Sequence, residues 1–372
     1  MANVKISQLT PKGANLEATD LLEISEFNGS GYETKSITGQ EIIDAVPSGA
    51  PAWLESDATD LTIWNNGKGN VASSTSFGEF ALRSNTSGKK NTAIGQYALA
   101  ANTNGLDNTA IGYNALRYSV SQQNTAVGSS VLQSANGLGN VGVGEMAGFS
   151  VDSGQENTLI GRRCGRSIQS VSYITSVGGQ SLVNSTSGTA LTAVGYSALN
   201  ANTSGAHNTA VGQYTLDANT IGDYNTAVGA EALGSSTNGS YNTVVGWGAG
   251  FAVSSGYSNV FLGYQAGNQL QTGGNNVCIG YNSNTTASYV KGAVAVGYGA
   301  SSFNFGTALG TDATCAWSGG VALGFQASTT ADYQFAVGSS SFPVGTVTTE
   351  SLSSTKTWSV RINGTDYKIL LA

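Results

Sequence analysis

The chain has 372 residues, of which 40% are hydrophobic and only 10% are charged, and its formal net charge is −7. Disordered chains combine low hydrophobicity with high net charge, so this composition predicts a folded protein. The acidic balance disfavours a nucleic-acid partner, because neutralising phosphates requires clustered Lys and Arg side chains. Gly, Asn or Ser interrupts every apolar stretch well before the roughly 18 residues of a membrane-spanning helix, so we expect no membrane insertion.

The first 72 residues differ in composition from the rest of the chain. Ten of the 22 acidic residues fall within residues 1–60, and the start lacks the charged and apolar regions of a secretion signal. We therefore expect synthesis in a cytoplasm, an N-terminal module over residues 1–46, and a linker or entry segment over residues 47–72. Residues 5–9, 20–25 and 36–42 predict short strands, and residues 39–46 predict one helical turn.

A repeat of mostly 17 residues occupies residues 73–341. Its marker is the glycine that closes each string of the type Asn-Thr-Ala-Ile-Gly. Two of the steps between markers are 16 residues, and the last three are 13, 14 and 14 residues. The 17 markers are Gly78, Gly95, Gly112, Gly128, Gly144, Gly161, Gly178, Gly195, Gly212, Gly229, Gly246, Gly263, Gly280, Gly297, Gly310, Gly324 and Gly338.

Each repeat predicts one coil of a β-solenoid. Thr or Val three positions before the marker, a small residue two before it and an aliphatic residue directly before it alternate with the period of a strand. A second short run, often ending in Ala-Leu, and a turn-rich string follow, so each coil should contain a four-residue strand, a bend, a second strand and a loop. The predicted fold class is an all-β parallel β-solenoid, or β-roll, of about 17 stacked coils of 14–17 residues.

Two positions of the coil predict how coils and chains pack. The asparagine that opens the string should stack as a ladder in which each side-chain amide bonds its neighbours. The ladder members are Asn91, Asn108, Asn124, Asn140, Asn157, Asn208, Asn225, Asn242, Asn259 and Asn276. The small residue in the middle of the strand predicts a packing face against other copies of the chain, and hence a homotrimer. The alternative is a single coil whose lumen is too narrow for larger side chains.

The residue after the marker forms a candidate binding surface. An aromatic ring occupies this position on four consecutive coils and on others before and after them, and rings at strand spacing can stack as a ladder. The aromatic stripe comprises Tyr196, Trp247, Tyr264, Tyr281, Tyr298 and Phe325. It predicts either packing inside the trimer or exposed rings that bind glycans by stacking. The glycan hypothesis fails if the rings are more than about nine-tenths buried.

Catalytic and metal sites are not predicted. No two acidic residues share a position one or two coils apart, which the paired carboxylates of a glycosidase would require. There is one histidine, and the three cysteines lack the spacing of a zinc site, so we expect no enzyme activity, no metal and no cofactor. His207 should stack on Tyr224 and Tyr241 at the surface. Glu145 and Arg162, on successive coils, should form an ion pair.

Residues 342–372 predict a C-terminal cap. Alternating runs at 358–362 and 365–371 flank Asn363 and Gly364, a pair that favours a type I′ turn, so we expect a β-hairpin. Its apolar face should cover the last coil and thereby prevent edge pairing with other chains.

The repeat strings, for example residues 108–116 (NTAIGYNAL), resemble the head repeats of trimeric autotransporter adhesins and arrays in fibre proteins of tailed bacteriophages. The resemblance covers residues 73–341 and implies a left-handed, trimeric β-roll. An autotransporter is expected to carry a secretion signal and a C-terminal membrane barrel. We expect neither here, so the resemblance favours the phage fibres, and the start of the chain is similar to fibre modules that attach to the virion.

The fibre resemblance implies a structural protein of a virion. We expect a tail fibre in which residues 1–46 bind other virion proteins and the array adheres to a glycan or protein of the host surface. A head-attached fibre or decoration protein is the alternative, and a polysaccharide-degrading tailspike is a weaker one because paired carboxylates are missing. A free ice-binding solenoid is disfavoured, because the threonines of the strands should lie partly inside the coil.

Overall fold

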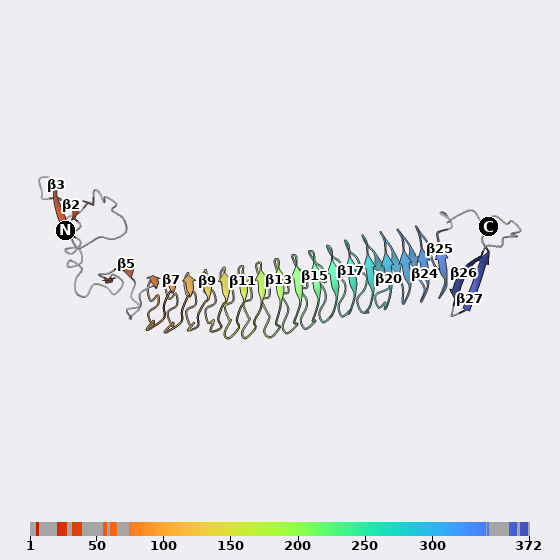
Figure 1. The fold of residues 1–372 in the computed structure, drawn as a ribbon, viewed down its shortest axis with the longest axis horizontal. Coiled ribbons are helices and arrows are strands. Elements are labelled where there is room, and N and C mark those ends of the chain that lie inside the picture. The colour runs from red at the N-terminus through yellow and green to blue at the C-terminus, as the bar shows by residue number, and fades with distance from the viewer. Residues whose placement is uncertain are drawn as a thin grey trace.

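The computed structural model describes residues 74–339 and 341 with their side chains, and the backbone of seven strands outside that range (Figure 1). These strands are β1 (Lys5–Ile6), β2 (Leu21–Phe27), β3 (Tyr32–Thr38), β4 (Glu55–Asp57), β5 (Asp60–Trp64), β26 (Thr357–Ile362) and β27 (Thr365–Leu370). The first three form one antiparallel sheet, and β4 pairs with β5. Short strands are thus present near the start of the chain, as predicted. The helical turn expected over residues 39–46 lies outside the described residues.

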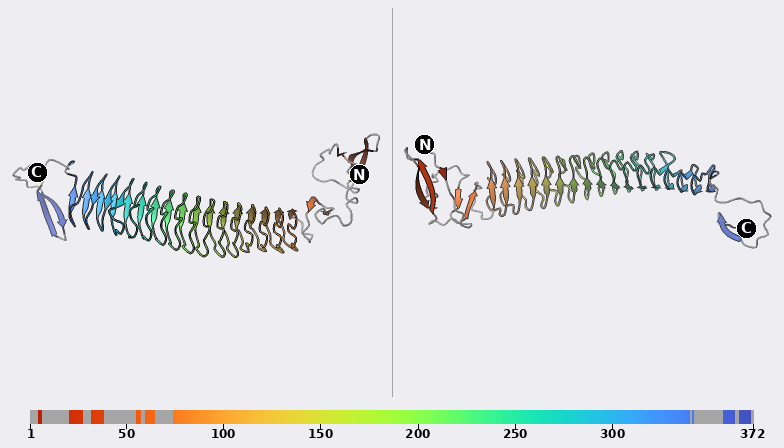
Figure 2. Two further views of the ribbon diagram at one scale, coloured as in Figure 1. Left: turned by 180° about the vertical axis from the view of Figure 1, so that it is seen from behind. Right: turned by 90° about the horizontal axis from the view of Figure 1, so that it is seen from above.

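Residues 74–339 form a rod of stacked coils, which we call rungs (Figures 1 and 2). Each rung contributes one three-residue strand to a parallel sheet, and neighbouring strands pair in register, so that Ala93 of β7 lies beside Ala110 of β8. The predicted parallel β-solenoid is confirmed. Its 17 strands are β6 (Thr75–Phe77), β7 (Thr92–Ile94), β8 (Thr109–Ile111), β9 (Thr125–Val127), β10 (Val141–Val143), β11 (Thr158–Ile160), β12 (Thr175–Val177), β13 (Thr192–Val194), β14 (Thr209–Val211), β15 (Thr226–Val228), β16 (Thr243–Val245), β17 (Val260–Leu262), β18 (Val277–Ile279), β20 (Val294–Val296), β22 (Thr307–Leu309), β24 (Val321–Leu323) and β25 (Phe335–Val337).

The prediction of a four-residue strand and a second strand in every coil was wrong. The strands have three residues, and in most rungs the run after the marker is a turn. The physical reason is the backbone of the fourth residue after the marker, where eight leucines have φ between +47° and +52°. This left-handed conformation breaks a strand, yet each rung still bonds the next one, as when Leu99 N donates to Ala115 O at 3.0 Å. A second parallel sheet forms only near the end, from β19 (Asn284–Thr285), β21 (Ser301–Ser302) and β23 (Thr314–Cys315).

The marker glycine is required by both conformation and space. Every marker from Gly78 to Gly324 has φ between +114° and +140°, a region that side chains with a Cβ atom avoid. A Cβ atom on Gly95 would also lie 2.7 Å from the carbonyl carbon of Gly112 on the next rung. Stacked rungs therefore touch backbone to backbone at this bend.

The core lies inside each coil, and this corrects the interpretation of the small mid-strand residue. Ala93, Ala110 and Ala210 are completely buried within a single chain, so they line the lumen and cannot form a face toward other copies. The alternative weighed above, a lumen too narrow for larger side chains, is the correct one. The leucine four positions after the marker, such as Leu99, fills the rest of the lumen and is also fully buried.

Where a large residue takes the mid-strand position, a glycine replaces the leucine. Phe261 is 1% exposed in the middle of β17. A Cβ atom on Gly267 would lie 2.6 Å from the ring of Phe261, and one on Gly250 would lie 3.0 Å from it. Leu159 has the same relation to Gly148 and Gly165, with distances of 2.7 and 2.8 Å. The volume of the lumen is thus conserved from rung to rung although its contributors change.

The C-terminal hairpin is confirmed at the level of the backbone. Strands β26 and β27 pair antiparallel with Ile362 beside Thr365, which leaves a two-residue connection. The predicted turn at Asn363 and Gly364, and the predicted covering of the last rung by the apolar face of the hairpin, concern residues outside those that the structure describes.

Candidate functional site

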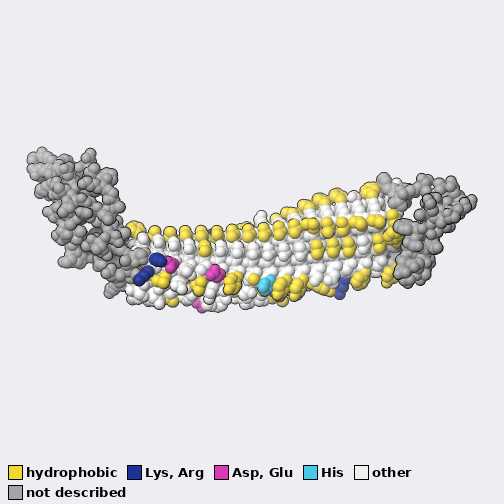
Figure 3. Space-filling view, in the orientation of Figure 1, with side chains coloured by type: hydrophobic (Ala, Val, Ile, Leu, Met, Phe, Trp, Pro, Cys, Tyr) yellow, Lys and Arg dark blue, Asp and Glu magenta, His cyan; other side chains and the backbone are white. Residues whose placement is uncertain are grey.

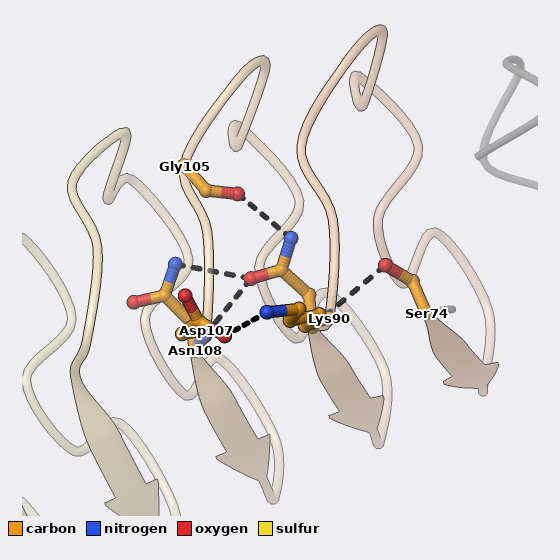
Figure 4. A network of polar contacts seen from close by, with 6 residues as sticks. Ser74, Lys90, Gly105, Asp107 and Asn108 are labelled. Atoms are coloured by element: carbon orange, nitrogen blue, oxygen red, sulfur yellow. Dashed lines mark hydrogen bonds and ion pairs between the residues drawn. The ribbon is translucent and has the colours of Figure 1, made fainter. Parts of the chain in front are cut away.

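The predicted asparagines form a buried column that joins the rungs (Figure 4). Asn108 donates its backbone N–H and its side-chain amide to Oδ1 of Asn91, at 3.0 and 3.1 Å. The Asn91 side chain in turn donates to the carbonyl of Gly105 at 2.8 Å. The same backbone bond links each later member to the one before it within two runs, from Asn91 to Asn157 and from Asn208 to Asn276. The column is structural, because its polar atoms are used up between rungs.

A second amide column, seven residues after the marker, was missed by sequence reasoning. Asn102 donates to Asn85 Oδ1 at 3.3 Å, and Asn219 donates to Asn202 Oδ1 at 3.0 Å. Serine replaces asparagine at some rungs of this column, and Asn219 Oδ1 and Ser236 Oγ then remain buried without a hydrogen-bond partner. The recurring Asn-Thr-x-Gly and Asn-Thr-Ser-Gly strings were the available signal, and they were interpreted as turns.

The outer face of the long sheet carries two parallel columns of side chains. In each strand the first and third residues face outward and the second faces the lumen, as in β7, where Thr92 is half-buried, Ala93 buried and Ile94 exposed. The strand threonines therefore lie on the outside, and the expectation that they lie partly inside was wrong. The third residue is aliphatic in every strand of the long sheet from β7 to β25 and is 36% exposed at Ile111 and 46% exposed at Leu262. Rows of hydrophobic side chains along the rod are visible in Figure 3.

The first column gains apolar residues toward the C-terminus. Thr243 is followed on the next three rungs by Val260, Val277 and Val294. The two columns together then form a wholly aliphatic strip. An ice-binding surface built on paired threonine columns does not fit this face, because its second column has no hydroxyl groups.

Four members of the aromatic stripe stack on consecutive rungs. The ring centroids of Trp247, Tyr264, Tyr281 and Tyr298 are 5.0, 4.9 and 5.2 Å apart, with interplanar angles of 15°, 6° and 6°. The rings are 41–57% exposed, far from the burial that would exclude glycan binding. However, each inner ring covers the face of its neighbour, so only edges and hydroxyl groups of Tyr264 and Tyr281 face solvent. Free faces for sugar stacking remain only at the two ends of the stack.

The other two stripe members lie outside this stack. Tyr196 meets Tyr214 edge to face, with centroids 5.5 Å apart and an interplanar angle of 90°. Phe325 is 42% exposed, and Thr311 separates it from Tyr298 in the column. The stripe thus comprises one continuous stack of four rings and two further rings outside that stack.

A second surface stack was predicted and is confirmed. His207 stacks on Tyr224 with centroids 4.8 Å apart, and Tyr224 stacks on Tyr241 at 5.1 Å. All three residues have φ near +60°, between 55° and 61°, and extend from the same bend on successive rungs. They support one another across the rungs at the surface.

The predicted ion pair is present, and the charged groups of the rod are otherwise sparse. Arg162 Nη1 lies 4.0 Å from Glu145 Oε2, and Lys90 Nζ lies 3.9 Å from Asp107 Oδ1 (Figure 4). All four side chains are about half exposed or more, so each pair contributes only about 0–1 kcal/mol to stability.

Two carboxylates interact although they occupy different positions of their rungs. Burial raises the pKa of Asp217 above its ordinary value, and the charge of Glu231 on the next rung raises it further, against hydrogen bonds from the Asp217 and Ala218 backbone. A search for matching positions could not find this pair, because neighbours in space need not share a position in the repeat. The arrangement destabilises the charged form of Asp217 and does not by itself form a catalytic site.

The three cysteines are free and buried. Burial raises the pKa of the Cys278 thiol to about 12, so this thiol stays protonated and unreactive at neutral pH. Within residues 74–339, no group of three or more His, Cys, Asp or Glu side chains could hold a metal ion. The search for membrane spans, limited to the described residues, finds no helix of the required length and hydropathy.

The sequence matches no protein-family model, no curated protein and no solved structure at a significant level. The rod itself, with its outer sheet face and its aromatic columns, is therefore the basis for any functional conclusion.

Proposed function

We propose that the chain is a structural fibre of a tailed bacteriophage virion, and that it acts as a homotrimeric tail fibre that adheres to the host surface. The observation that carries the proposal is the aliphatic column on the outer sheet face. With fifteen steps of about 4.8 Å between β7 and β25, this column is roughly 72 Å long. Exposed apolar surface of that extent is unusual for a monomer and marks an interface.

Copies of the same chain are the partner that fits this face best. The column repeats with the spacing of the rungs, so a second rod of the same kind can match it along its whole length. The face also lacks charge, which suits an interface between identical chains. The resemblance to trimeric β-rolls supports three copies around one axis, with the sheet faces directed inward. This revises the earlier assignment of the interface to the small mid-strand residues.

In this arrangement the rod is a stiff spacer with exposed edges. Residues 1–46 bind other virion proteins, and the edges of the rod that carry the aromatic stacks meet the host surface. Three chains present every such feature three times, so weak contacts to a repetitive glycan add up through avidity.

The mass of the purified protein in solution tests the trimer. We expect about three times the chain mass of 37.7 kDa by light scattering. Val211→Asp places a carboxylate on the aliphatic column and should dissociate the assembly. Ile221→Asp, in an exposed loop outside the sheet, is the matched control and should leave the mass unchanged. A monomeric native protein would contradict the proposal.

Labelling of intact particles tests the location. An antibody against residues 1–46 should mark the tail, and soluble fibre should compete with particles for adsorption to cells. A label on the capsid would favour the head-attached alternative, and release of reducing sugar from host polysaccharide would favour a tailspike.

A further inference from the structure

Three of the positive charges of the rod are concentrated on one rung. Residues 74–339 contain eight Lys and Arg side chains, and three of them, Arg162, Arg163 and Arg166, lie within five residues of each other. Arg162 is paired with Glu145. The other two guanidinium groups therefore decide what this rung presents to solvent.

The positions of Arg163 and Arg166 are neighbours on the surface of a rung. They are the second and fifth residues after marker Gly161. In the rung of Gly112 the side chains at the same two positions are in contact, with Arg117 Nη1 3.4 Å from Asn114 Oδ1. In the rung of Gly78, the guanidinium at the fifth position lies 5.5 Å from the ring at the second. Arg163 and Arg166 therefore extend from two positions whose side chains meet on other rungs.

No carboxylate compensates this pair within its two columns. The rungs on either side place Met146 and Gln180 next to Arg163, and Phe149 and Val183 next to Arg166. Two other cations of the rod, Lys90 and Arg162, are paired with an acid on the adjacent rung, whereas Arg83 and Arg117 lie over aromatic rings.

One hydrogen-bond donor of the Arg163 side chain is unsatisfied. Its Nε atom is buried without a hydrogen-bond partner, although the residue as a whole is only half-buried. Arg166 is exposed. The pair thus combines a half-buried guanidinium that has an unsatisfied donor with an exposed one, and guanidinium groups are well suited to binding an oxyanion.

We propose that Arg163 and Arg166 form an anion-binding site that takes the carboxylate or phosphate group of an acidic saccharide. Two adjacent guanidinium groups match the planar geometry of an oxyanion and each can donate two hydrogen bonds to it. The prediction that an oxyanion binds follows from the two arginines alone, whereas the prediction that this oxyanion belongs to a host polysaccharide rests on the proposed function. Three chains in a trimer would present the site three times.

Calorimetric titration of the full-length protein tests the site with three probes: an oligosaccharide containing glucuronic acid, a neutral glucose oligosaccharide of equal length and inorganic phosphate. We expect the uronic acid probe to bind at least tenfold more tightly than the neutral one. Its affinity should fall with added salt, because the contact is between charges. If phosphate binds and the uronic acid probe does not, the anion site is supported, but an acidic saccharide is overturned as its ligand.

Variants locate the binding. Arg163→Gln combined with Arg166→Gln should weaken the uronic acid probe at least tenfold, and Arg166→Gln alone, at an exposed position, guards against misfolding of the double variant. Arg83→Gln combined with Arg117→Gln removes the same charge from the other arginine-bearing rungs and should change the affinity less than twofold. Failure of the native protein to bind either acidic probe at millimolar concentration would overturn the proposal, as would equal binding by the double variant.

Adsorption of particles separates this inference from the proposed function. If particles carrying the double variant adsorb to cells as well as native particles do, the saccharide source is overturned and the fibre assignment stands. If the purified protein binds the uronic acid probe through the two arginines but is not part of a virion, the fibre assignment fails and the site stands.

Discussion

The long and the short rungs fill their lumens differently. In the rungs from Gly78 to Gly263 the fourth residue after the marker has a left-handed backbone, and where it is leucine it turns inward, as Leu99 does with φ of +49°. In the short rungs the fourth residue belongs to β21 or β23, and the fifth residue, Ser302 or Cys315, is the buried one. The comparison shows that a shorter loop leaves room for only small side chains, and the last rungs have their own small core of alanines around Cys315.

The two regions also differ in the way in which rungs are tied together. The buried asparagine column occupies most of the long rungs in two runs and ends at Asn276. At the same position the short rungs have Gly306 and Gly320, which carry no side-chain amide. The long rungs thus combine a large apolar lumen with polar ties, while the short rungs depend on backbone pairing in two sheets.

The largest effect is expected in the lumen of a long rung. Phe261→Ala should lower the free energy of unfolding by about 3–5 kcal/mol, because glycines on both sides leave nothing to fill the cavity. Cys315→Ala, in a short rung, should cost only about 1 kcal/mol because less volume is removed. Denaturant unfolding of both variants measures the difference. Equal losses would show that the two lumens are packed alike.

A complementary substitution sharpens the same point. Gly267→Leu alone should destabilise the protein, because its Cβ would lie 2.6 Å from the Phe261 ring. Combined with Phe261→Ala, the same leucine should restore part of the stability, since most other long rungs pair a small mid-strand residue with leucine. Thermal unfolding of the two single variants and the double variant checks this, and simple additivity would argue against volume exchange.

Loss of hydrogen bonds in the buried asparagine column of the long rungs should have the next largest effect on stability. Asn108→Ala removes the acceptor of the buried Asn124 backbone N–H and one of the two hydrogen bonds to Asn91 Oδ1, which keeps the bond from the backbone N–H of residue 108. We expect a loss of about 1–3 kcal/mol, the cost of unsatisfied buried groups. Asn104→Ala, at an exposed loop position, serves as the control and should change stability by less than about 0.5 kcal/mol.

A gain in stability is expected where the second amide column is interrupted. Ser236→Asn would supply an amide next to Asn219 Oδ1, which is buried without a partner. We expect the free energy of unfolding to increase by about 0.5–1.5 kcal/mol, the net value of one hydrogen bond. Denaturant unfolding should detect this increase. A loss would mean that the rung at Ser236 cannot accommodate the longer side chain.

The smallest effect depends on pH. Because burial raises the pKa of Asp217 in the folded chain, the unfolded chain releases this proton at lower pH, and stability is lost as pH rises above about 3.8. Asp217→Asn should therefore be more stable than the native protein at pH 7. The difference should vanish at pH 3, where the carboxyl is protonated in both states. A difference that is independent of pH would assign the effect to packing.

The repeat made most of the architecture predictable from the sequence. The marker glycines gave the rung length, the in-register pairing and the asparagine column, because each depends on residue types that recur at fixed spacing. The orientation of the strand was not predictable in the same way. Alternation shows that Ala93 and Ile94 face opposite sides, but it does not say which side is the lumen. We favoured an outward small residue, and the narrow lumen requires the opposite.

Features that depend on single residues were harder to predict. The left-handed backbone at Leu99 was missed because leucine rarely adopts it, and only hydrogen bonds between neighbouring rungs make it favourable here. The mutual coverage of the stacked rings of Tyr264 and Tyr281 also required coordinates, since sequence spacing places rings on a column but does not orient their planes.

The boundary between the two buried clusters has a mechanical consequence. A load applied to the ends of the rod passes through every interface between rungs in series, so the weakest interface sets the force at which the rod fails. The main cluster ends at Ala300 and the small one begins at Ala308, beyond the last asparagine tie. A chain pulled from both ends of the rod should therefore tear first at this junction and leave the long rungs intact.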